Sequence, residues 1–68
     1  MDASTFEPIR LRVSRELIGL SQNQLAAMVG LSPAAISQFE SGATRPSPET
    51  LDALGEALAV PVGFFSRP

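Results

Sequence analysis

The chain has 68 residues with no cysteine and no histidine, and its formal net charge is −2 at neutral pH. This length allows one small domain over residues 1–68, and a hydrophobic fraction of 44% is typical of a folded chain. The missing thiols and imidazoles exclude disulfides, the usual zinc sites and the common nucleophile–base pairs. We therefore expect no metal, no cofactor and no enzyme activity. Since the chain lacks a long apolar run and a signal-peptide pattern, we expect a cytoplasmic protein.

Charged residues are unevenly distributed along the chain. Three arginines crowd one short segment, at Arg10, Arg12 and Arg15, whereas a later segment contains only acids, at Glu49, Asp52 and Glu56. A nucleic-acid-binding domain is usually basic, but the distribution of charge matters more than its sum. The sequence therefore predicts a molecule with a basic end and an acidic end.

Proline, glycine and serine divide the chain into five expected helices. Pro8 suits the first turn of a helix that runs to about Ile18, and Gly19 ends it. The later helices are expected to begin after serine caps and to end at glycines or before Pro61, with a capping box formed by Ser21 and Gln24. This predicts helices over 8–18, 22–29, 33–41 and 48–58, a last short turn containing Phe64 and Phe65, an N-terminal arm over 1–6 and a tail over 66–68.

The second and third expected helices have the spacing of a helix-turn-helix. Ala26 is small where the two helices cross, Gly30 allows a left-handed turn, and Ile36 fills the space between the helices. Any short helical hairpin could contain one of these residues by chance. All three together, with caps at Ser21 and Ser32, indicate the motif much more specifically.

A longer pattern resembles the Cro and phage-repressor helix-turn-helix family, also called xenobiotic-response-element-type regulators. The resemblance extends from Pro8 to Phe65 and is carried by Ser21, Gln22, Leu25, Ala26, Gly30, Leu31, Ser32, Ile36, Ser37, Glu40, Gly42 and Pro46. It implies an all-α, five-helix, lambda-repressor-like domain. It also implies sequence-specific binding of double-stranded DNA, by a homodimeric transcriptional regulator that is more often a repressor than an activator.

Helical geometry divides the third helix, over about 33–41, into two faces. At 100° per residue, Phe39 and Glu40 share the side of Ile36. A carboxylate on that inner side needs a partner, and we expect an ion pair between Arg15 and Glu40, which the resemblance also implies. The alternative is that both charged side chains are exposed and do not interact. The opposite face is small and polar, with Ala34, Ser37, Gln38 and Ser41.

If the third helix enters the major groove, its outer face and N-terminus would contact base edges. The candidate base-reading residues are Ser32, Pro33, Ala34, Ser37 and Gln38. Candidate phosphate contacts, at the start of the second helix and in the loop after the third, are Ser21, Gln22, Asn23, Ser41 and Arg45. The serines can instead be plain helix caps and the glutamines solvated side chains. For Arg10 and Arg12, phosphate contact and simple solubilisation both remain open.

A second function stays open because the third helix contains no lysine or arginine. The domain can instead be an interaction module of an antitoxin or of a longer regulator with a C-terminal effector domain. Ile9, Val13 and Leu17 form a second apolar stripe on the first helix, which either packs against Phe64 and Phe65 or faces a partner. A C-terminal domain or a protein partner would bind through Ile9, Val13, Leu17, Phe64 and Phe65. An acidic patch over the helix-turn-helix would favour this second function.

Overall fold

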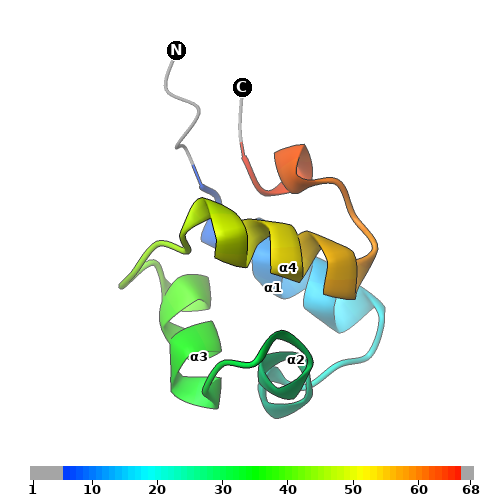
Figure 1. The fold of residues 1–68 in the computed structure, drawn as a ribbon, viewed down its shortest axis with the longest axis vertical. Coiled ribbons are helices and arrows are strands. Elements are labelled where there is room, and N and C mark those ends of the chain that lie inside the picture. The colour runs from blue at the N-terminus through cyan, green and yellow to red at the C-terminus, as the bar shows by residue number, and fades with distance from the viewer. Residues whose placement is uncertain (1–5, 67–68) are drawn as a thin grey trace.

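The computed structural model describes residues 6–66, which form four α-helices and one terminal 3₁₀ turn (Figure 1). The elements are α1 (Pro8–Leu17), α2 (Gln22–Val29), α3 (Pro33–Ser41), α4 (Pro48–Leu58) and η1 (Val62–Phe65). The predicted order is confirmed, although the fifth element is a 3₁₀ turn and not an α-helix. The expected arm and tail lie, apart from Phe6 and Ser66, outside the described residues. No helix within 6–66 is long and apolar enough to cross a membrane.

Serine caps begin three of the helices, as the sequence predicts. The side-chain oxygens of Ser21, Ser32 and Ser47 each accept a hydrogen bond from the backbone amide three residues later. At α2 the capping box is complete, because the Gln24 side chain also accepts from the Ser21 amide at 2.8 Å. These local bonds satisfy amides that a helix leaves unpaired, and they set where α2, α3 and α4 start.

Left-handed residues end three helices. Gly30 and Gly42 have φ of 73° and 83° at the ends of α2 and α3. The third is Ala59, which ends α4 with φ of 59°, a conformation that alanine rarely adopts. α1 ends at Leu17, one residue earlier than predicted, and Ile18 is its C-cap.

One apolar core joins all five elements. It consists of Leu11, Leu25, Ala26, Ile36, Phe39, Leu54, Leu58 and Phe65. Ile18, the C-cap residue of α1, is 50% exposed and lies outside this core.

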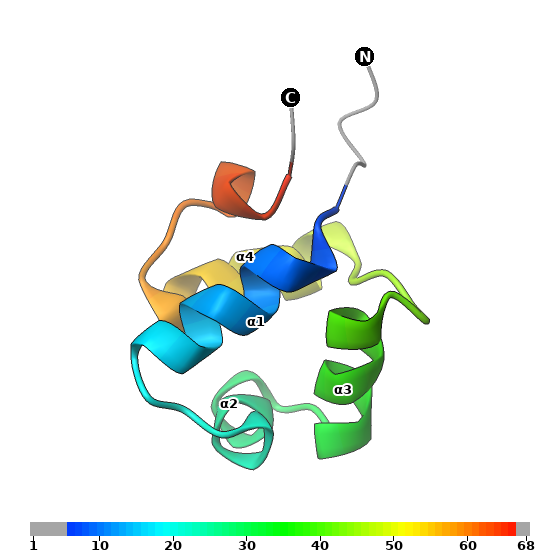
Figure 2. The same ribbon diagram turned by 180° about the vertical axis from the view of Figure 1, so that it is seen from behind.

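The C-terminal turn closes the core beside the start of α1, so the two ends of the described chain meet (Figure 2). Phe6 and Ser66 form an isolated antiparallel bridge, and the Glu7 amide donates to the Phe65 carbonyl at 2.7 Å. Phe65 is fully buried, whereas Phe64 is half-buried with the Arg10 guanidinium 5.2 Å from its ring centroid.

The outer stripe of α1 remains open to solvent. Ile9, Val13 and Leu17 are 56%, 40% and 78% exposed. The alternative in which this stripe packs against Phe64 and Phe65 is therefore wrong, because those rings face the core and Arg10.

Candidate nucleic-acid interface

The turn between α2 and α3 has the close packing that a helix-turn-helix requires. Ala26 and Ile36 are 1% and 0% exposed at the crossing of the two helices. At Gly30, a Cβ atom would meet nothing within 4 Å, so glycine is needed there for its positive φ and not for space. All three predicted packing residues of the motif are confirmed in their places.

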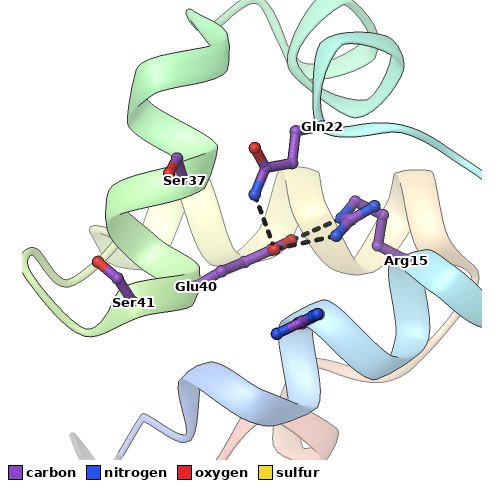
Figure 3. A pocket seen from close by; sticks show the side chains of 6 residues that line it. Arg15, Gln22, Ser37, Glu40 and Ser41 are labelled. Atoms are coloured by element: carbon purple, nitrogen blue, oxygen red, sulfur yellow. Dashed lines mark hydrogen bonds and ion pairs between the residues drawn. The ribbon is translucent and has the colours of Figure 1, made fainter.

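A buried ion pair fixes α3 against α1 (Figure 3). Arg15 donates from Nε to Glu40 Oε2 at 2.7 Å and from Nη2 to Glu40 Oε1 at 3.0 Å. A third donor, Arg15 Nη1, reaches the Leu20 carbonyl at 2.7 Å and so holds the loop before α2. The predicted pair is confirmed, and the side chains are only 10% and 5% exposed.

Gln22 joins this pair from the first turn of α2. Its Nε2 donates to Glu40 Oε1 at 3.0 Å, so one carboxylate connects α1, α2 and α3. Burial of the Glu40 carboxyl raises its pKa, but the hydrogen bonds from Arg15 and Gln22 together with the charges of Arg15 and Arg12 outweigh burial, so the net pKa is lowered. The Arg15 pKa is raised, chiefly by its hydrogen bonds to Glu40. The carboxylate therefore stays ionised, and the three helices are pinned at neutral pH.

The opposite face of α3 is exposed, as predicted. Ala34, Ser37, Gln38 and Ser41 all face solvent, and so do Ser32 and Pro33 at its start. Within residues 6–66, the side chains of Ser37 and Gln38 have no hydrogen-bond partner. Ser41 is already engaged, since its hydroxyl donates to the Gln38 carbonyl at 3.1 Å. The face thus offers free polar groups on a rigidly held helix.

The predicted phosphate contacts divide into two groups. Gln22 and Ser41 lie with Ser37 around one hollow between the three helices, next to the start of α2 where Ser21 and Asn23 are exposed. Arg45 lies apart, in an apolar hollow lined also by Phe6, Pro46, Pro48, Leu51, Asp52, Val62 and Ser66. The first hollow also contains Arg12, which the sequence could not assign to any site.

The arginines of the predicted basic end are engaged by other groups of the fold. Arg15 is paired with Glu40, and Arg12 donates from Nε to Glu16 at 3.2 Å. Arg10 stacks on Phe64 and donates to its carbonyl at 3.3 Å. The acidic end is present on α4, where Glu49, Asp52 and Glu56 are exposed. No cluster of metal-binding side chains occurs among the described residues.

Comparisons with known proteins agree with this geometry. The profile of the helix-turn-helix family matches residues 11–65. The chain belongs to this family. The repressor protein C2 of Salmonella phage P22 is 45% identical over 49 residues, which are 72% of this chain and 23% of that protein. A crystal structure of the P22 c2 repressor with a synthetic operator superposes with a TM-score of 0.84, at 37% identity, covering 88% of this chain and 91% of that one.

A further relative is an uncharacterised HTH-type transcriptional regulator of Sinorhizobium medicae. It is 34% identical over 56 residues, which are 82% of this chain and 40% of that regulator. The chain therefore spans less than half the length of these two relatives. The expected all-α, repressor-like helix-turn-helix fold is confirmed by the family match and by the structural superposition.

Proposed function

We propose that this domain binds double-stranded DNA sequence-specifically, as the DNA-binding part of a transcriptional repressor. The exposed, small and polar face of α3, held in place by the buried Arg15–Glu40 pair, carries this proposal. Small side chains let a helix approach the floor of the major groove closely, and free polar groups can then bond base edges. The similarity to a repressor crystallised with its operator supports the same function.

In the proposed complex, α3 lies in the major groove and α2 crosses the backbone. Gln38 is the main base reader, because its amide can bond an adenine edge through two hydrogen bonds, and Ala34 can contact a thymine methyl. Ser32, Pro33 and Ser37 complete the base-facing surface. Phosphates are bound by Ser21, Gln22 and Asn23 at the start of α2, and by Ser41 and Arg45 after α3. The amides of Gln22 and Asn23 suit an anion, because the capping box engages only those of Ser21 and Gln24.

We also propose that the protein binds as a homodimer, since one half-site specifies too few bases for a unique operator. The proposed role is DNA binding and not catalysis, and it needs no metal or cofactor. We place the protein in the cytoplasm, together with the DNA that it binds. Contact with a C-terminal domain or a protein partner would use the stripe of Ile9, Val13 and Leu17, which is exposed. Phe65 cannot contribute as first expected, because it is fully buried.

The interaction-module alternative is favoured by that exposed stripe but not by the charge on the helix-turn-helix. α2 and α3 contain one acidic residue between them, Glu40, and its side chain is 5% exposed. The outer surface of the motif therefore presents no acidic patch that would repel DNA. This absence favours DNA binding for the α2–α3 face and leaves the α1 stripe as a separate contact surface.

The test is a binding selection with the purified chain on a random duplex library at low salt. We expect enrichment of one short motif, arranged as a two-fold repeat if the protein binds as a dimer. The same selection with a variant whose α3 face is altered, Gln38→Ala, serves as the control and should lose or change the motif. No enrichment over unselected DNA by the wild-type chain would contradict the proposed function.

A further inference from the structure

The polar hollow between α1, α2 and α3 lies at the edge of the proposed DNA-reading face (Figure 3). Its walls are Arg12 and Arg15 from α1, Gln22 from α2, and Ser37, Glu40 and Ser41 from α3. Ser37 belongs to the base-reading face and Gln22 to the phosphate-binding turn. In the proposed complex, a DNA backbone bound by Gln22 would therefore run beside this hollow.

The hollow contains hydrogen-bond donors that the fold does not use. Gln22 gives one amide hydrogen to Glu40 and keeps the second, and the Ser37 hydroxyl has no partner within residues 6–66. Arg15 is different, because Glu40 and the Leu20 carbonyl already engage its three nitrogens. The cation with unengaged nitrogens is Arg12, whose side chain is 57% exposed.

Glu16 holds the Arg12 guanidinium in the free protein. Glu16 Oε2 lies 3.2 Å from Arg12 Nε and 3.8 Å from Arg15 Nη2. Around the hollow, two guanidinium groups are thus balanced by two carboxylates, Glu16 and Glu40, and the formal charge is zero. Glu40 is buried and its role is structural, whereas Glu16 is 54% exposed and takes no part in the core.

We propose that Arg12 contacts a DNA backbone phosphate at this hollow, and that Glu16 weakens DNA binding by competing with the phosphate for Arg12. This inference rests on the proposed function. A phosphate accepts hydrogen bonds as a carboxylate does, so it can replace Glu16 on the guanidinium. Because the phosphate must first displace Glu16 from Arg12, part of the gain from the phosphate contact is lost, which keeps the affinity for DNA low.

Of the two arginines that the sequence left open as phosphate contacts, Arg10 is not available at this hollow. It lies two residues earlier on α1, about 200° around the helix, and its guanidinium is held by the Phe64 ring and carbonyl. The sequence left both arginines open as phosphate contacts. The structure directs Arg12 to the hollow and Arg10 to the C-terminal turn.

The experiment measures binding of the chain to a selected duplex and to random DNA across a salt series. Glu16→Gln should tighten binding to both duplexes about two- to fivefold, within the range of an exposed ion pair. Arg12→Gln should weaken both about tenfold and reduce the salt slope by about 0.9 per subunit. The matched control is Glu56→Gln, the same change at an exposed acid near the end of α4, which should alter affinity less than Glu16→Gln does.

The double variant Arg12→Gln with Glu16→Gln separates competition from a general charge effect. If Glu16 acts through Arg12, removing it in the Arg12→Gln background should give no more gain than Glu56→Gln gives. Equal gains from Glu16→Gln in both backgrounds would overturn the proposal, and so would an Arg12→Gln variant that binds like the wild type. Urea midpoints confirm that each variant is folded. A wild-type chain that binds no DNA would instead refute the proposed function itself.

Discussion

The inner and outer faces of α3 lie on one short helix, but their side chains make different contacts. On the inner face, Ile36 and Phe39 are buried, and Glu40 accepts hydrogen bonds from two other helices. On the outer face, Ser37 and Gln38 are exposed and have no partner in the described chain. Changes on the inner face should therefore alter stability, and changes on the outer face should alter binding alone.

The largest effect is expected on the inner face. Glu40→Ala leaves Arg15 buried without its partner and should cost about 3 kcal/mol of unfolding free energy, because an unpaired buried charge is poorly solvated. Urea midpoints of Arg15→Ala, Glu40→Ala and the double variant measure the coupling. If the two single losses simply add in the double variant, the residues do not interact.

The same face predicts how stability responds to acid. The folded-state pKa of Glu40 is lowered from 4.5, so its contribution to stability is complete above that value and is lost as pH falls through the folded-state pKa. The measurement is the melting temperature of the wild type and of Glu40→Gln from neutral pH to about pH 3, which shows how much stability each protein loses in acid. Glu40→Gln should lose less stability on acidification than the wild type does. Identical acid responses in wild type and Glu40→Gln would contradict this role.

The outer face should behave in the opposite way. Gln38→Ala should cost about 1–3 kcal/mol of binding free energy on the selected site and little on random DNA, with stability changed by less than about 0.5 kcal/mol. Arg45→Ala is the comparison, since a phosphate contact should weaken both duplexes alike and flatten the salt slope. Titrations on both duplexes distinguish the two. Equal losses on both for Gln38→Ala would show that it does not read bases.

On the outer stripe of α1 we expect an effect on stability as small as that of Gln38→Ala. Val13→Glu places a charge at a site that is 40% exposed, so the unfolding free energy should change by less than about 0.5 kcal/mol. If the stripe contacts a second copy or another domain, sedimentation should reveal weaker association. A loss of several kcal/mol on melting would mean that the stripe is packed in the folded monomer.

Most of the fold could be predicted from the sequence because its signals are local. Ser21 with Gln24, Ser32 before Pro33 and Ser47 before Pro48 define helix starts within a few residues. The end of α4 at Ala59 carries no such signal, since alanine does not favour a left-handed conformation. In this conformation the Val60 amide donates to the Gly55 carbonyl at 3.0 Å, a helix ending for which residue 59 carries no glycine signal.

The candidate site was only partly predictable. Helical periodicity places Glu40 inward and leaves Arg15 as its natural partner, so the pair could be inferred. The third member, Gln22, could not, because an uncharged amide on a first turn is compatible with solvent, phosphate or carboxylate. Arg12 and Arg10 must point to different sides of α1, but only the packing of η1 and α3 decides which neighbour each one meets.

The central claim is tested most directly by an NMR titration of the isotope-labelled chain with its selected duplex. We expect the largest chemical-shift changes at Gln22 and Asn23 and along the outer face of α3, at Ala34, Ser37 and Gln38. The stripe of Ile9, Val13 and Leu17 should shift little under these conditions. Changes confined to that stripe, with the signals of α3 unmoved, would contradict DNA recognition by α3.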